Sequence, residues 1–381
     1  MVNYKFIQSK NSHTLSERFE WLDGLRGCVI LFVVLFHSSQ VFPKDALLRS
    51  FFSFVQYGVQ LFFVVSALTC ILTLKNNQIA DWYIRRFVRI ALIYYVGILL
   101  YYPIFYLEAM MGVKSYEFSE PYNIIANILF IHGWIPSANN NVVPGGWSIA
   151  VEMNFYLIAP LIIFLAFKIK KWIAWLNFFI VIFFLSLNQI YNSPVVNNSY
   201  EYFWPINQLP VFFAVMGIYY FYNYYSTFRF WKNYDPNYIK IIIGLLFIFI
   251  AIYLGAYSNI NHVITPTLIG CGFFIFIAGL GCYRKILELN ILIYLGRISF
   301  SLYIVHFAFE HGIRFLLHIF ERSYEVNFIG YLFSIFLILI LSIISAHIIH
   351  IKIEGKYSVL SRKLINFKNN LLHSKLESKS E

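Results

Sequence analysis

Long apolar segments are the feature of this sequence that most restricts its fold. Hydrophobic residues make up 60% of the 381 positions and charged residues 12%, about half the charge of a soluble domain. Runs of about 20 apolar residues can cross the hydrocarbon core of a bilayer as helices. Ten such runs follow one another, at residues 24–42, 52–74, 88–110, 147–167, 172–191, 204–224, 239–257, 263–282, 291–313 and 328–351. We therefore predict an all-α, polytopic integral membrane protein with about ten transmembrane helices.

The distribution of basic residues predicts the orientation of these spans. Lys and Arg concentrate in every second connection, for example at 85–89, at 168–171 and after Lys352. Basic loops stay on the cytoplasmic side of a membrane, so we predict that both termini are cytoplasmic. Membrane topology thus accounts for the net charge of +11, and we expect lipid rather than nucleic acid as a partner.

Composition divides the chain into three parts. Residues 1–20 are polar and are expected to form a cytoplasmic N-terminal segment without a cleavable signal peptide. Residues 21–351 form the membrane domain, and 352–381 form a basic cytoplasmic tail that suits an anionic inner leaflet.

The apolar run 124–134 is too short to cross the bilayer, which favours a re-entrant or interfacial piece. The four cysteines form no CxxC pair, so we expect neither a disulfide framework nor a metal site.

Two ionisable residues lie within the first predicted span. Arg26 is near its start, and His37 follows eleven positions later. Eleven residues make about three helical turns, so both side chains lie on one face, roughly 16 Å apart along the axis. Ionisable groups at this depth are costly unless they face a partner or a wet cavity. His37 is therefore our candidate general base. The alternative is a structural histidine, with Arg26 as a topology anchor.

An arginine cluster marks the start of the third predicted span. Arg86 and Arg89 are three residues apart and therefore share a helical face. Guanidinium groups bind phosphates bidentately, which makes this pair a candidate site for a cytosolic ligand that carries phosphates. Anchoring by positive charge alone is the competing interpretation.

The fourth predicted span opens with Gly-Gly-Trp-Ser at 145–148. Ser148 and Glu152 are four residues apart and face the same way. A lone carboxylate about one turn below the outer interface is costly unless it has a partner or a function. We therefore expect Glu152 to orient an acceptor hydroxyl or to pair with His37. In the alternative, Glu152 reaches water at the rim and Trp147 is an interfacial belt residue.

The ninth predicted span carries Arg297 near its inner end and His306 nine residues later. In a continuous helix they lie roughly 13 Å apart along the axis, on different but not opposite faces. His306 is either a second polar contact in the cavity of His37 or a structural histidine. Asp23, Trp147, Arg297 and His306 complete the candidate residues, as possible contacts to a substrate.

Together and in this order, these segments resemble the membrane-bound acyltransferase family 3. The resemblance rests on Asp-Gly-Leu-Arg-Gly at 23–27 with its downstream His, Arg-x-x-Arg at 86–89, Trp-Ser-x-x-x-Glu at 147–152, and Gly-Arg-x-Ser-x-Ser-Leu-Tyr at 296–303. It covers about residues 20–315. The chain departs from the pattern where many relatives have two consecutive acidic residues, because Met153 follows Glu152, and Asn154 stands where many have Gln.

The resemblance implies a membrane O-acyltransferase, usually an O-acetyltransferase, located in a bacterial cytoplasmic (inner) membrane. The acyl group passes from cytosolic acyl-CoA, such as acetyl-CoA, to a hydroxyl of a surface polysaccharide or a lipid-linked oligosaccharide. No metal is required. By this resemblance the donor side has Arg26, Arg86 and Arg89, the catalytic histidine is His37, and the acceptor side has Ser148 and Glu152.

Two other classes of function remain open from the sequence. A proton-coupled transporter or flippase would use the same buried Arg, His and Glu as a proton relay, although no internal repeat of the kind common in transporters is evident. A sensor or scaffold without catalysis is the third class. For the enzyme we favour direct attack of the acceptor hydroxyl on the donor, since the sequence offers no separate nucleophile.

Overall fold

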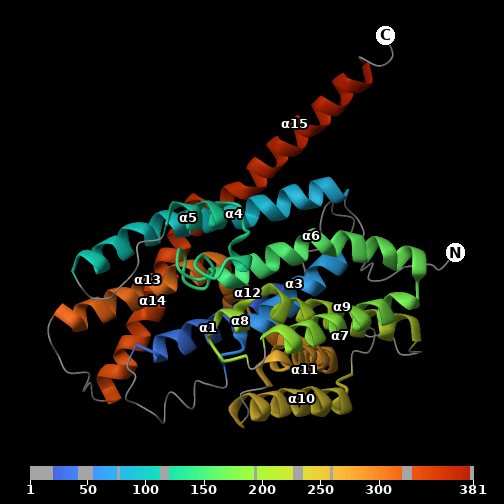
Figure 1. Ribbon diagram of the computed structural model, residues 1–381, viewed down its shortest axis with the longest axis horizontal. Coiled ribbons are helices and arrows are strands. Elements are labelled where there is room, and N and C mark those ends of the chain that lie inside the picture. The colour runs from blue at the N-terminus through green and yellow to red at the C-terminus, as the bar shows by residue number, and fades with distance from the viewer. Residues whose placement is uncertain are drawn as a thin grey trace.

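The structure, a computed structural model, is all-helical over the residues that it describes (Figure 1). These residues are 20–41, 55–74, 78–111, 120–192, 195–225, 235–257, 261–319 and 328–377. The longer helices are α1 (Glu20–Ser39), α3 (Gly58–Leu74), α4 (Ile79–Met110), α6 (Gly146–Ile169), α7 (Trp172–Asn192), α9 (Pro205–Tyr225), α10 (Tyr238–Tyr257), α11 (Thr265–Gly279), α13 (Ser299–Ile319), α14 (Phe328–Lys352) and α15 (Tyr357–Glu377). The shorter ones are α5 (Pro121–Ile128), η1 (His132–Trp134), α8 (Tyr200–Phe203), η2 (Asn261–Val263), η3 (Gly281–Glu288), α12 (Asn290–Arg297) and η4 (Glu354–Lys356).

The helices confirm a membrane protein but not the predicted number of spans. Six are long and apolar enough to cross a membrane, and the number rises to eight if each of two bent pairs is one span. The helix α3 has only 17 residues, and α9 carries Asn207 and Gln208 in its first turn. The count of ten is therefore not confirmed, and the cytoplasmic position of the termini stays a prediction.

Parts of the predicted elements lie outside the described residues. This holds for 1–19 of the predicted N-terminal segment, for 52–54 of the second predicted span and for 378–381 of the tail. The predicted interfacial piece at 124–134 consists of α5, which has eight residues, and η1. Its length agrees with the expectation that this run does not cross the bilayer.

The prediction of one continuous helix over 291–313 is wrong. The helix α12 ends at Arg297, and α13 starts at Ser299 after a bend of 73°. The Ser299 hydroxyl donates to the Gly296 carbonyl at 2.8 Å and so satisfies one of the carbonyls that a helix end leaves free. The separation and relative orientation that a continuous helix would give Arg297 and His306 therefore do not apply. A second bend, of 99°, separates α11 from η3 at the end of the predicted span 263–282.

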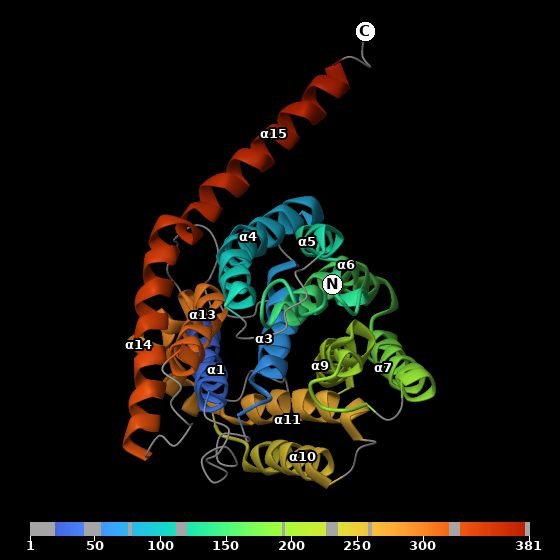
Figure 2. The same ribbon diagram turned by 60° about the vertical axis from the view of Figure 1, so that its left-hand side comes forward.

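The short helix α3 occupies the centre of the bundle. Figure 2 shows it surrounded by α1 and α13 on one side, α4 and α6 on another, and α9 and α11 on the remaining sides. Most of its side chains are buried, including Phe63, Leu68 and Ile71. The outer helix α10 has the opposite character, because only 11% of its apolar stretch is buried inside the protein. Its exposed apolar face suits contact with lipid.

Two distant sequence motifs meet where α1 crosses η3 and α12. A Cβ atom added to Gly24 would lie 1.5 Å from the carbonyl oxygen of Leu287, and one added to Gly296 would lie 1.7 Å from that of Asp23. Only glycine permits so close an approach of two backbones. The motifs at 23–27 and 296–303 therefore form one packed unit, and this contact fixes α1 against α12 and α13.

The C-terminal helix α15 projects from the bundle (Figure 1) and packs against α4. The Lys368 ammonium forms an ion pair with the Asp81 carboxylate in the first turn of α4. Before α15 begins, the buried Glu354 carboxylate accepts hydrogen bonds from the Ser301 hydroxyl at 2.7 Å and from His350 Nδ1 at 3.0 Å. The predicted tail is thus a helix tied to the start of α4 and to α13.

We predict that Gly24→Ala destabilises the protein by about 1–3 kcal/mol, the usual cost of overpacking a filled site, because the new methyl group meets backbone rather than a flexible side chain. Gly312→Ala is the matched control, since nothing lies within 4 Å of a Cβ at that helical position. The control should be neutral or stabilising by about 0.5–1 kcal/mol. Thermal unfolding of the purified protein in detergent measures both, and equal melting temperatures would contradict the close backbone contact.

Candidate functional site

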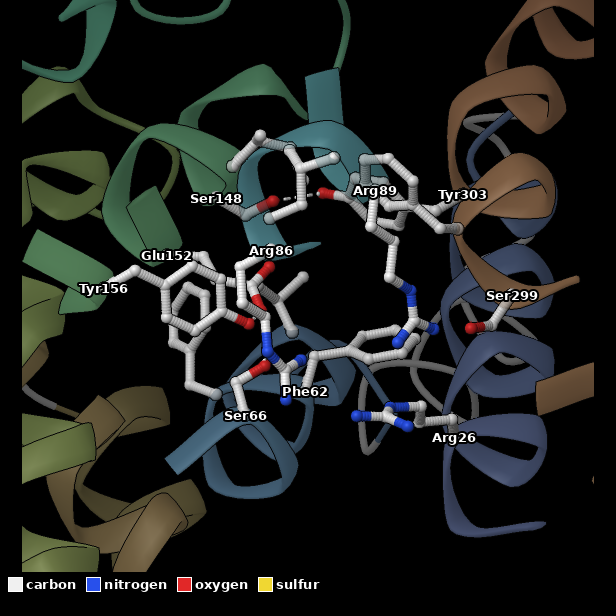
Figure 3. Close-up of a pocket in the computed structure, with 15 residues that line it drawn as sticks. Arg26, Phe62, Ser66, Arg86, Arg89, Ser148, Glu152, Tyr156, Ser299 and Tyr303 are labelled. Carbon is white, nitrogen blue, oxygen red and sulfur yellow. Dashed lines mark hydrogen bonds between the residues drawn. The ribbon is translucent and has the colours of Figure 1, made fainter. Parts of the chain in front are cut away.

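A pocket with about 690 Å³ of empty space lies between α1, α3, α4, α6 and α13 (Figure 3). Its polar lining consists of Arg26, Ser66, Arg86, Arg89, Ser148, Glu152, Tyr156, Ser299 and Tyr303. Its apolar lining consists of Val59, Phe62, Phe63, Ile90, Ile149 and Phe300. The structure therefore brings together six predicted site residues from three separate motifs, namely Arg26, Arg86, Arg89, Ser148 and Glu152 on the pocket wall and Asp23 behind it.

Arg26 reaches the pocket from the first turns of α1. Its Nη1 forms an ion pair with Asp23 Oδ1 at 3.2 Å, and its Nη2 donates to the Thr69 hydroxyl of α3 at 3.0 Å. The Arg26 side chain is only 12% exposed. Asp23 thus holds the arginine in place and does not line the pocket itself. The prediction that Asp23 contacts a substrate receives no support from this arrangement.

Arg86 and Arg89 enter the pocket from α4. The Arg86 guanidinium lies 5.6 Å from the ring centres of both Trp82 and Tyr156, which are cation–π distances. Arg89 makes no hydrogen bond or ion pair with any described residue. Figure 3 shows its guanidinium pointing into the pocket on the side of Ser299 and Arg26. Arg89 is therefore the guanidinium with the most capacity to bind a ligand.

The start of α6 is shaped by the Gly-Gly-Trp-Ser segment. Gly145 caps the helix with a φ of 75°, a left-handed conformation that favours glycine. The hydroxyls of Ser148 and Tyr303 lie 2.8 Å apart, and they reach the Gly145 carbonyl at 2.9 and 3.0 Å. These contacts join α6 to α13 at one wall of the pocket.

Glu152 is the one carboxylate on the pocket wall. It accepts hydrogen bonds from the Ser66 hydroxyl and from the phenol of Tyr156 four residues later. The expected pairing of Glu152 with His37 is absent from the contacts of the described residues. Glu152 instead fixes Tyr156, whose ring packs against the Arg86 guanidinium. Three arginines and one carboxylate leave the pocket with a surplus of positive charge, which favours an anionic ligand.

His37 lies beyond the pocket rather than on its wall. Its ring centre is 4.6 Å from that of Phe307 and 5.5 Å from that of His306. The ring of His306 is in turn 5.8 Å from the ring of Tyr303, which does line the pocket. Tyr303 and the two histidines therefore form a continuous series of rings that leads from the pocket to His37.

His306 is fully buried, and only one of its ring nitrogens has a partner. Its Nδ1 lies 3.2 Å from the Leu302 carbonyl oxygen, whereas its Nε2 has no hydrogen-bond partner. The buried Nε2 without a partner among the described residues favours one of the two interpretations that the sequence left open, a second polar contact in the region of His37. The ring contact with His37 agrees with this interpretation.

Two further candidates lie outside the pocket. Trp147 is buried, and its ring stacks on that of Phe203 at 4.7 Å, so its interpretation as an interfacial belt residue is wrong. Arg297 is exposed at the end of α12 and does not line the pocket. Its neighbour Ser299 does, because the bend between α12 and α13 turns the chain inward.

His132, which belongs to none of the sequence motifs, supports the start of α6. The loop imidazole is fully buried, and its Nε2 lies 2.9 Å from the Gly146 carbonyl oxygen and 3.1 Å from the Tyr94 hydroxyl. Burial lowers the pKa of His132 to about 4, so the ring is neutral near pH 7 and donates through Nε2 to the carbonyl. Ser66, Tyr156, Ser299 and Tyr303 line the pocket but were not predicted as site residues, although Ser299 and Tyr303 belong to the motif at 296–303.

Metal-binding groups do not gather at this site. Within the described ranges, no three His, Cys, Asp or Glu side chains lie close enough to hold a metal ion. The groups that the pocket offers are guanidinium, hydroxyl and phenol donors, which suit phosphate oxygens.

Sequence comparisons relate the chain to two kinds of named protein. A profile described as an acyltransferase domain matches residues 19–347. The probable poly-beta-1,6-N-acetyl-D-glucosamine export protein of Staphylococcus aureus is 24% identical over 262 residues, which are 66% of this chain and 68% of that protein. The peptidoglycan O-acetyltransferase OatA of Listeria monocytogenes is 29% identical over 178 residues, which are 40% of this chain and 25% of that protein. No solved structure matches the chain.

We predict that the pocket binds pyrophosphate through Arg89. Charge-assisted hydrogen bonds contribute about 1.5–3 kcal/mol each, so Arg89→Ala should weaken pyrophosphate binding at least about tenfold. Arg85→Ala is the matched control, because Arg85 lies on the same helix but is exposed and does not line the pocket. The readout is the rise in melting temperature that pyrophosphate produces in the purified protein. An equal rise in both variants would show that the anion binds elsewhere.

Proposed function

The chain belongs to the membrane-bound acyltransferase family 3, and on this premise we propose that it is an O-acetyltransferase of the cell surface. The donor in this proposal is cytosolic acyl-CoA, and acetyl-CoA is the simplest case. The acceptor is a hydroxyl of a polysaccharide or of a lipid-linked oligosaccharide in a bacterial cytoplasmic membrane. The name of OatA, an O-acetyltransferase that acts on peptidoglycan, supports this class of reaction.

One observation carries the proposal, namely the convergence of three guanidinium groups in a single pocket among apolar helices. Buried cations repel one another and are costly within a bilayer, so their gathering needs a ligand with several negative charges. The phosphates of coenzyme A meet this need, and Arg89 has donors that no described residue engages. Arg26 and Arg86 are already oriented by Asp23 and Tyr156, which lowers the entropy cost of binding.

The donor and the acceptor meet, in this proposal, on the side of the pocket formed by Tyr303. Acyl-CoA supplies, when bound, an activated thioester carbonyl. His37 takes the proton of the acceptor hydroxyl, so that the hydroxyl oxygen can form the new ester bond. His37 then returns this proton to the departing sulfur, which leaves as the thiol, and the histidine is neutral again.

Direct transfer is favoured over an acyl-enzyme formed on Ser148 because the hydroxyl of Ser148 is already engaged. Ser148 lies within hydrogen-bond distance of both the Gly145 carbonyl and the Tyr303 hydroxyl, so it has a positioning role between α6 and α13. Glu152 is likewise assigned to positioning, because it holds Tyr156 against Arg86. The reaction then needs only one group that changes its protonation state, His37.

Export of a glycan is the second candidate function. It is favoured by the name of the Staphylococcus aureus relative, which describes an export protein for a poly-N-acetylglucosamine. In that function the buried arginines, His37 and Glu152 would form a proton relay for transport. The two functions differ in what the cell surface loses when His37 is removed, since export changes the amount of glycan and transfer changes its acetyl content.

We predict that His37→Ala lowers the acetyl content of the surface glycan by at least about 100-fold, the range that general base catalysis contributes. The measurement is the ratio of acetyl groups to sugar in the glycan from cells that express each variant at equal protein level. His347→Ala, on the exposed face of α14, is the control and should keep the ratio. An unchanged ratio with less glycan at the surface would favour export instead.

We predict that Glu152→Gln lowers turnover about tenfold while the protein level changes little. Loss of the charge-assisted hydrogen bonds from Ser66 and Tyr156 releases the ring that packs on Arg86, and such bonds are worth about 1.5–3 kcal/mol. Glu288→Gln, an exposed carboxylate in η3, is the control. Equal losses of activity and of protein in the Glu152 variant would point to a structural role alone.

A further inference from the structure

A series of polar side chains continues along α13 beyond the pocket. Tyr303, His306 and Glu310 follow one another at spacings of three and four residues and therefore lie on one helical face. Tyr303 lines the pocket, His306 contacts the ring of His37, and Glu310 lies one turn further along the helix. The series thus extends from the arginines past His37 toward the opposite end of the bundle.

Glu310 is a buried carboxylate with unused hydrogen-bonding capacity. Its side chain is only 3% exposed, and its Oε1 has no hydrogen-bond partner. The nearby cation is Arg314, one turn later on α13, whose Nη2 donates to the backbone carbonyl of Gln40 at 3.4 Å. No ion pair joins Glu310 to Arg314 within the described part of the chain.

A second buried carboxylate lies on the adjoining helix α4. Glu108 is 5% exposed, and its Oε1 is 2.8 Å from Nδ1 of His311, the residue that follows Glu310. The other oxygen, Oε2, has no partner. Tyr101, two turns before Glu108, donates to the Ile304 carbonyl at 2.5 Å and so fastens α4 to α13. Glu108 and His311 therefore lie in the interface between these helices, and Glu310 precedes His311 directly in the sequence.

Three buried atoms in this region lack partners, namely Nε2 of His306, Oε1 of Glu310 and Oε2 of Glu108. A buried polar atom without a hydrogen bond costs about 1–3 kcal/mol, and more when it is charged. Carboxylate oxygens are acceptors, so they need donors, and sugar hydroxyls are donors.

We infer that Glu310 and Glu108, with His306, form a hydroxyl-binding subsite for a sugar acceptor on the side of His37 opposite to the arginines. The inference rests on the proposed acyl transfer and adds to it the location of the acceptor. It also explains why Ser148 and Glu152 share one pocket with the three arginines. These two residues belong to the donor side, and the acceptor reaches His37 from the end of α13 that carries Glu310.

The test uses the purified full chain in detergent and three soluble probes: tri-N-acetylchitotriose, a β-1,6-linked N-acetylglucosamine trisaccharide and a muropeptide. Saturation-transfer NMR first measures probe binding without any acyl-CoA. We expect at least one probe to bind the wild type, and Glu310→Gln and Glu108→Gln each to weaken its binding about tenfold. Glu120→Gln is the matched control, because Glu120 is an exposed carboxylate just before α5, and it should bind as the wild type does.

Kinetics with acetyl-CoA and the bound probe provide the second readout. Both carboxylate variants should raise the KM for the probe about tenfold and leave the KM for acetyl-CoA unchanged, with melting temperatures close to that of the wild type. Binding of no probe to the wild type, or equal binding by all variants, would overturn the subsite. A rise in the KM for acetyl-CoA would also overturn it. Probe binding that depends on Glu310 and Glu108 but leads to no acetyl transfer would instead support the subsite and contradict the proposed enzyme.

Discussion

Backbone contact between α1 and α12 is the constraint on which the rest of the site depends. Gly296 lets α12 approach Asp23 of α1, and Gly24 lets α1 approach Leu287 of η3, so closely that no side chain fits between the backbones. The contact places the start of α1 beside the bend that leads into α13. Arg26 and Tyr303 reach the same pocket for this reason, although they are far apart in sequence. Loss of this contact would separate the two walls without removing any polar group.

The electrostatics of the pocket then follow from what each arginine already contacts. Arg26 is compensated by Asp23, and Arg86 is covered by two aromatic rings. Arg89 has neither kind of partner among the described residues. Contacts within the protein thus offset the cost of burying Arg26 and Arg86. The charge of Arg89 is compensated only by a bound ligand. This division gives the pocket both a preformed geometry and a strong preference for anions.

Helical spacing predicted the members of the site better than their arrangement. Arg86 with Arg89 and Ser148 with Glu152 lie on common faces as their spacing indicated, because α4 and α6 are continuous helices. The same arithmetic failed for Arg297 because the chain bends at Ile298, between Gly296 and Ser299, and these two residues entered the prediction only as parts of a motif. Trp147 looked like a belt residue because its ring is covered by α3 and α8, which are distant in sequence. Partners such as Ser66 carry no sequence signal of their own.

The ion pair between Lys368 and Asp81 connects α15 to the helix that supplies two arginines of the pocket. Asp81 lies in the first turn of α4, and Arg86 and Arg89 follow on the same helix. A purification tag fused to α15, or a partner that grips it, therefore pulls on the helix that supplies two of the three guanidinium groups. A force on α15 is therefore transmitted to one wall of the pocket.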